Sequence, residues 1–218
     1  MHPARAGAGV LTTSELSLSV RDLACERGGR LVFEGLSFSL GHSEALVLTG
    51  PNGAGKSSLL RQLAGLLDVT QGEIELSGGD PERTIGEQAH YVGHLDALKP
   101  SMSVVETIEF WRSFLGSIPQ GAETALEALG LAHLADLPVA YLSAGQRRRL
   151  SLARLIAVPR PIWLLDEPTV ALDAASVARL VALMKGHLGH GGMIVAATHL
   201  DLGLDGARQL RLGAGVAV

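Results

Sequence analysis

The sequence predicts an α/β fold in which helices cover a parallel β-sheet and a helical lobe is inserted into the core. Three observations lead to this prediction. Short, almost wholly apolar runs at 45–50, 162–167 and 193–199 are typical of strands buried on both faces. Helical spacing follows the first two of these runs, and alternation of strand and helix indicates a parallel sheet. Between about 94 and 157 the pattern is helical throughout, which favours a lobe inserted into the sheet-bearing core.

The composition limits the function classes. The chain has 218 residues, of which 47% are hydrophobic and 18% charged, so one large domain can bury a sizeable core. The net charge of −4, with no basic stripe beyond residues 147–149, argues against a nucleic-acid partner. The single cysteine, Cys25, excludes an internal disulfide framework and fits a reducing compartment.

The N-terminal residues 1–14 are expected to form a flexible tail, because they lack the apolar core of a secretory signal. The remainder, 15–218, is expected to form a single domain. No run reaches the roughly 18 uncharged apolar residues that a membrane-spanning helix needs. If the protein works at a membrane, we expect another subunit to supply the spans.

The elements before the lobe are expected in the following order. Four stretches are typical of short or half-buried strands: 16–23, 36–40, 72–78 and 90–93. A helix is expected from Lys56 to about Leu67, directly after the apolar run that ends at Gly50.

The lobe and the elements after it are predicted from helix-start signals. Ser103 and Glu106 have the spacing of a capping box, which opens a helix reaching Leu115. A second helix is expected over 123–130, where it ends at a glycine cap. A third helix begins at Ser143, and a last one runs from about Ala174 to His187.

The stretch GPNGAGKS matches the phosphate-binding P-loop and stands, as the motif requires, between a strand and a helix. Backbone N–H groups wrap the phosphates there, and the helix start adds its positive dipole end. Lys56 is expected to reach the β- and γ-phosphates and Ser57 to bind Mg²⁺. The alternative is a glycine-rich turn that fits by chance. The predicted nucleotide contacts are Gly50, Pro51, Asn52, Gly53, Ala54, Gly55, Lys56, Ser57 and Ser58.

Two acids end the apolar run at 162–167. Asp166 is expected to hold Mg²⁺ through water, and Glu167 to orient or deprotonate the attacking water. Taken alone, the pair could be solvated turn residues. His199, which ends the last apolar run, can bond a γ-phosphate or serve a structural role. His187 and His190 are interpreted as surface residues and not as metal ligands, because no further ligands are evident.

The stretch LSAGQRRR (142–149) is unusual for a helix start. Ser143 stands where an N-cap should stand, and three arginines then occupy the first turn, where the helix dipole disfavours positive charge. This arrangement indicates a second helix start that faces an anion. The chain therefore has two phosphate-facing surfaces and one magnesium site. We expect a head-to-tail homodimer in which the Ser143 loop of each copy closes on the ATP of the other.

Together these motifs resemble the ABC-type ATPases over nearly the whole chain. GPNGAGKSS resembles Walker A, LSAGQ the family signature, IWLLDEP Walker B, ALD (171–173) the D-loop, and TH (198–199) the switch histidine. The resemblance implies a P-loop core with an antiparallel β subdomain and the helical lobe. It also implies Mg²⁺-dependent ATP hydrolysis between two subunits, which drives a membrane partner. The signature and D-loop nucleotide contacts that it implies are Ser143, Gly145, Gln146 and Asp173.

Other stretches resemble a narrower group, the ATP-binding subunits of cytochrome c maturation, or haem exporter ATPases. They are ACERGGRLVFEGLSF, YVGHLDALKPSMSVVETIEFW and LSAGQRRRLSLARL. This resemblance implies a peripheral ATPase on the cytoplasmic face of a bacterial inner membrane, with integral membrane subunits as partners and haem export or haem-chaperone release as its work. The alternatives are the ATPase subunit of another ABC exporter and a soluble ABC ATPase without a transporter.

The chain departs from the family pattern at several places, and two of them concern the predicted metal and adenine contacts. His94 stands where most members carry a glutamine that touches Mg²⁺ or water, so the imidazole or a water must serve. The stretch CERGGR lacks the usual aromatic residue for adenine, which leaves Arg27, by cation–π contact, or Phe33. A docking surface for the partner is expected at Phe110, Trp111 and Phe114, unless these side chains pack the lobe.

Overall fold

A computed structural model of the chain describes residues 16–116 and 121–213; the expected tail at 1–14 lies outside them. An antiparallel sheet has the strand order β2–β1–β4, with β1 at Ser17–Arg27, β2 at Arg30–Gly41 and β4 at Gln71–Ser77. β1 and β2 are longer than the strands predicted at 16–23 and 36–40. Between them, Gly28 (φ 58°) and Gly29 (φ 73°) supply the left-handed backbone of a two-residue hairpin turn.

A second sheet is parallel and has the order β5–β6–β7–β3–β8. Its strands are β3 (Ala45–Thr49), β5 (Ala89–Val92), β6 (Ile162–Asp166), β7 (Met193–Ala197) and β8 (Arg208–Arg211). The predicted parallel sheet is confirmed. β8 was not predicted, because its sequence RQLR is half charged and lies at the exposed sheet edge.

Helices join the strands as the sequence predicts. The α-helices are α1 (Lys56–Leu63), α2 (Val104–Leu115), α3 (Ala122–Ala128), α4 (Ala144–Ala157) and α5 (Ala174–Gly189). Single 3₁₀ turns are η2 (Gly86–Gln88), η3 (Ala132–Leu134) and η4 (Val139–Tyr141). α1 ends before the predicted Leu67, because Gly65 (φ 67°) stops it: the Gly65 and Leu66 N–H groups bond back into the last turn, in a Schellman motif.

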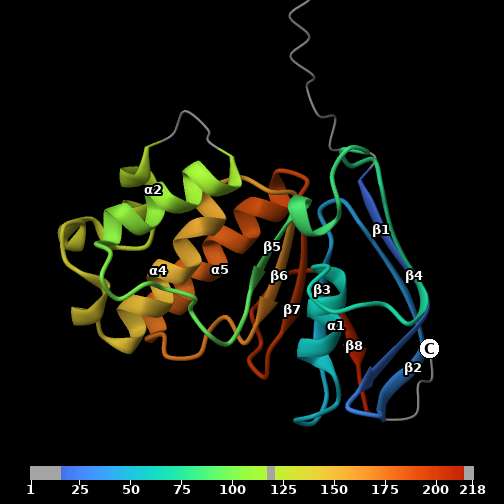
Figure 1. Cartoon of the computed structure of the whole chain (residues 1–218). Coiled ribbons are helices and arrows are strands. Elements are labelled where there is room, and N and C mark those ends of the chain that lie inside the picture. Colours follow the sequence, from blue (N-terminus) through green and yellow to red (C-terminus); the bar gives the residue numbers. More distant parts are fainter. Residues whose placement is uncertain (1–15, 117–120, 214–218) are drawn as a thin grey trace, which may run out of the picture.

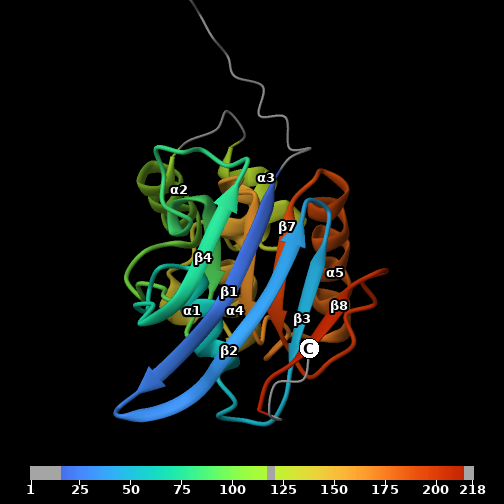
Figure 2. The same ribbon diagram turned by 90° about the vertical axis from the view of Figure 1, so that its right-hand side faces the viewer.

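The parallel sheet separates two hydrophobic cores (Figure 1). Alternate residues of β6 enter them, because successive side chains of a strand point to opposite faces. Trp163 and Leu165 join the core formed with α2, α3, α4 and α5, whereas Ile162 and Leu164 join the core under α1 and the antiparallel sheet. Figure 2 shows the antiparallel sheet crossing in front of the parallel one. Among the described residues, no helix is both long and apolar enough to cross a membrane.

One prediction for the surface was wrong. His187 belongs to α5, where its ring is stacked on Trp163 with 4.0 Å between ring centroids and an interplanar angle of 8°. The ring lies so close to the chain reversal after α5 that a Cβ on Gly192 would come within 2.2 Å of its Nε2. The glycine-rich sequence suggested a surface loop, but glycine here makes room for a packed imidazole. His190 is exposed, as predicted.

Candidate active site

The P-loop lies between β3 and α1, where its glycines are sterically required. Gly50 has φ 129°, and a Cβ there would meet the Leu212 carbonyl oxygen at 2.3 Å. Gly55 has φ 99°, and a Cβ there would meet Val32 and Phe33 at 2.7 Å. Only glycine fits both positions, because both the backbone angle and the space exclude a side chain. The loop therefore turns its backbone N–H groups around the start of α1.

Lys56 is the first residue of α1 and is 8% exposed. Its Nζ donates to the carbonyl oxygens of Gly50 at 2.7 Å and Pro51 at 3.0 Å. The ammonium group therefore lies across the mouth of its own loop. This is the side on which an anion wrapped by the loop amides would sit.

A cavity of about 360 Å³ opens on this loop. It joins the P-loop to both acids at the end of β6 and to two residues of the β1–β2 hairpin. Eight residues predicted to bind the phosphates or Mg²⁺ or to act on the attacking water line it: Asn52, Gly53, Gly55, Lys56, Ser57, Ser58, Asp166 and Glu167. The other two lining residues are Arg27 and Val32. Hydroxyl, ammonium and carboxylate groups thus converge on one space.

The two predicted adenine contacts are placed differently. Arg27 lines the cavity at the end of β1, whereas Phe33 is 7% exposed and packs in the core beside Gly55. Its neighbour Val32 takes the place at the cavity wall. Arg27 and Val32 are therefore the hairpin side chains that a base above the P-loop would meet.

Asp166 is buried at the end of β6, and Tyr91 approaches it in a way that the sequence did not predict. The Tyr91 hydroxyl lies 3.5 Å from Asp166 Oδ2 and accepts a hydrogen bond from Arg61 Nε at 3.2 Å. The hydrogen bond and the charge of Tyr91 raise the pKa of Arg61. A tyrosine in a predicted strand gives no signal of such a contact, because only the register of β5 against β6 brings it to the aspartate.

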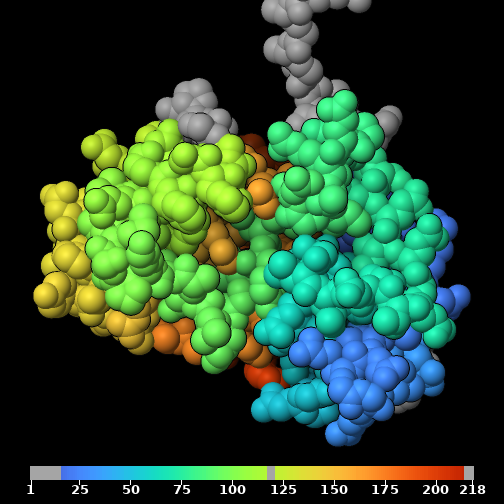
Figure 3. All heavy atoms as spheres, viewed as in Figure 1, coloured from blue at the N-terminus to red at the C-terminus, as the bar shows by residue number. Residues whose placement is uncertain are grey.

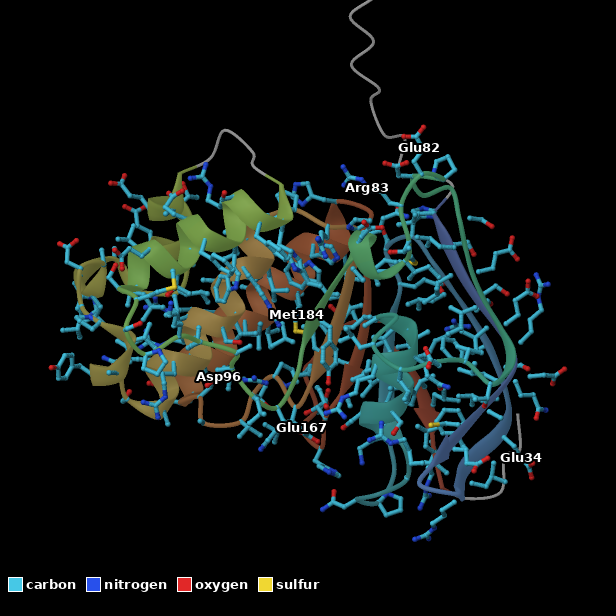
Figure 4. The ribbon with its side chains drawn as sticks, viewed as in Figure 1. Glu34, Glu82, Arg83, Asp96, Glu167 and Met184 are labelled. Atoms are coloured by element: carbon cyan, nitrogen blue, oxygen red, sulfur yellow. The ribbon has the colours of Figure 1, made fainter. Side chains whose placement is uncertain are left out.

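Glu167 has an unusual backbone. It is in the left-handed region, with φ 46°, and its N–H donates to the Ala197 carbonyl oxygen at 2.8 Å. Its carboxylate Oε1 lies 3.5 Å from His199 Nε2. The side chains of the two acids therefore diverge, as the sequence predicts for adjacent residues at a strand end. Figure 4 labels Glu167 at the end of the sheet.

The LSAGQ residues form a helix start that is already capped. The Ser143 hydroxyl accepts from the Gln146 N–H at 3.2 Å, and Gln146 Oε1 accepts from the Ser143 N–H at 2.7 Å. A Cβ on Gly145 would lie 2.9 Å from the Ala171 carbonyl oxygen, so this glycine lets the signature pack on the ALD stretch. None of the residues 143–146 lines the described P-loop cavity. The predicted signature contacts are thus not brought to Lys56 within one copy.

Asp173 caps α5. Its Oδ1 accepts from the Ser176 N–H at 2.7 Å, and these bonds to Ser176 lower the pKa of the carboxyl group. Asp173 is therefore fixed at the start of α5, two residues after Ala171, whose carbonyl oxygen packs against Gly145 of the signature. It does not line the P-loop cavity either.

The three arginines that follow Gln146 all bond acceptors of their own copy. Arg147 Nη1 donates to the Leu142 carbonyl oxygen, and Arg149 Nη1 to the carbonyl oxygens of Leu129 (2.9 Å) and Gly130 (3.2 Å). Arg148 is buried and also bonds carbonyl groups of this chain. The guanidinium groups are therefore engaged with backbone carbonyl oxygens and, for Arg148, also with the Asp96 carboxylate.

His94 lies apart from the P-loop cavity. It lines a neighbouring groove together with Tyr91, Leu95 and Arg61 of α1. His94 does not line the cavity that holds Ser57 and Asp166, and its metal contact stays a prediction. Tyr91, three residues earlier, holds the position beside Asp166.

The chain matches the family model for ABC transporters over residues 33–170. Curated relatives match the chain over a longer stretch than this family model does. The chain is 60% identical over 198 residues to the cytochrome c biogenesis ATP-binding export protein CcmA of Nitrobacter winogradskyi, covering 91% of this chain and 98% of that protein. This chain belongs to the CcmA group of the ABC transporter ATP-binding proteins. A protein of the same name from Rhodopseudomonas palustris is 59% identical over 197 residues, covering 90% and 98%.

Solved structures bear out the ABC ATPase fold. An ATP-binding subunit of an ABC transporter has a TM-score of 0.78 at 23% identity, covering 89% of this chain and 85% of that one. An Atm1-family ABC exporter with ATP bound has a TM-score of 0.78 at 23% identity, covering 97% of this chain and 39% of that one. ABC ATP-binding proteins are ATPases, so this member of the CcmA group is an ATP-hydrolysing enzyme.

Proposed function

We propose that this chain is the ATP-hydrolysing subunit of an ABC export complex in c-type cytochrome biogenesis, at the cytoplasmic face of a bacterial inner membrane. One observation carries the catalytic part: a single cavity collects Lys56, Ser57, Asp166 and Glu167. The name of the relatives, a cytochrome c biogenesis ATP-binding export protein, supports the biological setting. Haem, or a haem-loaded chaperone, is the cargo that this setting favours.

Each residue of the cavity has a chemical task in this proposal. The P-loop amides and Lys56 bind the ATP phosphates. The Ser57 hydroxyl and the Asp166 carboxylate fit Mg²⁺, which prefers few protein oxygens and keeps waters and phosphates as its other ligands. When bound, the ion neutralises charge on the phosphate oxygens. Glu167 accepts the proton of the attacking water, and His199 orients the glutamate and the γ-phosphate.

The second half of the site comes from another copy of the chain. Residues 143–146 are partly exposed and do not line the P-loop cavity of their own copy. Their helix start is capped by Ser143 and Gln146 of the same copy. A head-to-tail homodimer brings this helix start, with Gly145 and the neighbouring Asp173, over the partner copy's ATP. The dimer is two-fold symmetric, which is the commonest symmetry of homo-oligomers.

A groove of about 440 Å³ next to His94 suits a membrane partner (Figure 3). Leu66 and Leu95 line it and are 63% and 82% exposed, and Arg61, Arg154 and Arg160 also line it. An apolar segment that carries a carboxylate, from a cytoplasmic loop of the membrane subunit, fits this chemistry. On α2, the predicted docking residues Phe110 and Phe114 are exposed and stacked on each other. Trp111 is buried, so it packs the lobe and does not belong to that surface.

Mixed dimers test the composite site. Lys56→Ala removes the phosphate ligand, whereas Ser143→Asp keeps an N-cap residue and places a negative charge where the partner's phosphate would lie. Each variant alone is expected to be inactive. A mixed pair holds one site with both defects and one intact site, so a mixture should hydrolyse ATP faster than either variant. Activity of the mixture no higher than that of the separate variants would refute the dimer.

A genetic test addresses the proposed role in c-type cytochrome biogenesis. In a bacterium that lacks its own CcmA, the chain should restore haem-stained c-type cytochromes, and Glu167→Gln should not. Restoration by the Glu167→Gln variant would refute an ATP-driven role in this process. Hydrolysis without restoration would favour another ABC exporter or a soluble ABC ATPase.

A further inference from the structure

Arg148 connects three segments that are far apart in the sequence. It is 3% exposed and is the fifth residue of α4. Its Nη2 donates to the carbonyl oxygens of Glu167 at 2.7 Å and Asp166 at 3.1 Å, and its Nε to that of Pro168 at 3.3 Å. Its Nη1 donates to the carbonyl oxygen of Gly93 at 2.8 Å and to Asp96 Oδ1 at 3.3 Å.

The contacts of Arg148 include the backbone of the acid proposed as the base. The Glu167 backbone is left-handed and is held on both sides: its N–H donates to Ala197, and its carbonyl oxygen accepts from Arg148 at 2.7 Å and from the Val170 N–H at 3.3 Å. A strained residue keeps its conformation only when its surroundings determine it. Arg148 therefore makes the shortest of these bonds and is the side chain among the groups that fix the direction in which Glu167 leaves β6.

The other end of the guanidinium reaches the segment after β5. Gly93 and Asp96 flank His94, and Asp96, which is 25% exposed at its side chain, forms the ion pair of Arg148. Asp96 and Glu167 come from different segments but lie at the same end of the molecule (Figure 4). A displacement of the 93–96 segment therefore pulls directly on the guanidinium that holds Glu167.

Arginine is suited to this place for a geometric reason. A guanidinium presents five N–H donors in one plane, and here all three nitrogens bond acceptors in two segments. A lysine at 148 would keep the charge but offers one nitrogen, which cannot reach both segments at once. The conservative replacement therefore removes the connection and retains the charge.

We propose that Arg148 is a positioning residue for ATP hydrolysis, which holds the Glu167 backbone in its catalytic direction. Through Gly93 and Asp96, Arg148 also connects Glu167 to the segment that borders the groove next to His94. This rests on the proposed role of Glu167 as the base. In this arrangement a partner seated in the groove changes the hydrolysis rate by moving the 93–96 segment. Binding of ATP itself does not involve Arg148.

The test compares Arg148→Lys with Arg149→Lys, the neighbouring arginine that bonds only lobe carbonyls. For Arg148→Lys, kcat should fall about 10- to 100-fold, the range expected when a reacting group is misplaced, while KM and nucleotide affinity change less than about twofold. Arg149→Lys should keep both constants. A folded Arg148→Lys variant with wild-type kcat, or with an equal loss of affinity, would overturn the proposal.

A double variant separates positioning from general damage. In the Glu167→Gln background there is no base to position, so adding Arg148→Lys should reduce the residual single-turnover rate less than about twofold. A further loss as large as in the wild-type background would refute the proposal.

If Arg148→Lys does not fold, Asp96→Asn replaces it: kcat should fall with unchanged nucleotide affinity, and an unchanged kcat refutes the link between Asp96 and Glu167. Glu167→Gln with normal turnover would instead refute the proposed function.

Discussion

Nε2 of His199 lies 3.5 Å from Oε1 of Glu167, across the ends of neighbouring parallel strands. Asp166 and Ala197 are paired in the register of β6 and β7, so the residues that follow them emerge side by side. The His199 side chain is 60% exposed and that of Glu167 is 23% exposed. Both side chains therefore lie at the carboxyl ends of β6 and β7, and His199 is the more accessible of the two.

We expect Glu167→Gln to lower ATP turnover by about 100-fold or more, as the loss of a general base does, with nucleotide affinity retained. The amide has the same shape as the carboxylate but cannot accept the proton. Phosphate release and titration with a fluorescent ATP analogue measure the two quantities. Glu34→Gln, which changes an exposed carboxylate on β2, is the control. Normal turnover in the Glu167 variant would remove it from the chemistry.

Lys56→Ala should weaken nucleotide binding about 10- to 100-fold, because hydrogen bonds to a charged group contribute about 1.5–3 kcal/mol. Lys185→Ala is a matched control, since this lysine is half-exposed on α5 and pairs with Asp205 at 3.8 Å. Isothermal titration with a nonhydrolysable ATP analogue gives both affinities. Equal affinities in the two variants would contradict the assignment of Lys56.

Two glycines should respond in opposite ways to alanine. At Gly186, in α5, a Cβ meets no atom within 4 Å, so the variant should gain about 0.5–1 kcal/mol in free energy of unfolding. At Gly50 a Cβ would meet Leu212 O at 2.3 Å, and the loop must move. Gly50→Ala should lower both stability and nucleotide affinity. Urea titrations report stability, and a stable Gly50→Ala variant with full affinity would disprove the steric requirement.

One buried histidine, His90, and one half-buried histidine, His187, predict acid sensitivity. Burial lowers the pKa of His187 to about 4 and that of His90 to about 3, from an ordinary value of 6.5. Between these values and 6.5 the unfolded chain binds more protons, so their contribution is complete above pH 6.5 and is lost as the pH falls. His187→Phe keeps a ring against Trp163 but removes the titration.

The expected effect of His187→Phe is a shallower pH dependence of the unfolding free energy between pH 6 and 4.5, by about 1.4 kcal/mol per pH unit. Urea midpoints measured at several pH values give this slope. Parallel curves for wild type and His187→Phe would show that this histidine is protonated without cost.

A negative charge introduced into the groove should disrupt the association with the membrane partner. Leu95→Asp puts a carboxylate beside the proposed acidic partner segment, so co-purification with the membrane subunits should be lost while basal ATPase activity remains. Phe114→Asp tests the alternative surface on α2. Leu31→Asp, an exposed leucine of the β1–β2 hairpin, is the control. Loss with Phe114→Asp alone would move the docking site from the groove to α2.

Several elements were predictable because their signals are local. The helix start at Ser103 depends on a capping box of residues three positions apart, and the P-loop depends on one strand–turn–helix unit. Both are present as predicted. The contacts that were missed all join distant segments: Tyr91 to Asp166, and Arg148 to Gly93 and Glu167. A tyrosine or arginine at such a position has no local pattern that names its partner.

The sequence by itself determined the α/β class, the family and the set of groups able to bind a nucleotide, because spacing along one strand or helix specifies them. Only the tertiary structure decided how those groups meet. The parallel register brings Glu167 to His199, and the packing of α4 against two strand ends brings Arg148 to the carbonyl oxygens of Gly93 and Glu167. The reason is physical: hydrogen bonds between segments depend on the packing of the whole sheet, which no single stretch of the chain contains.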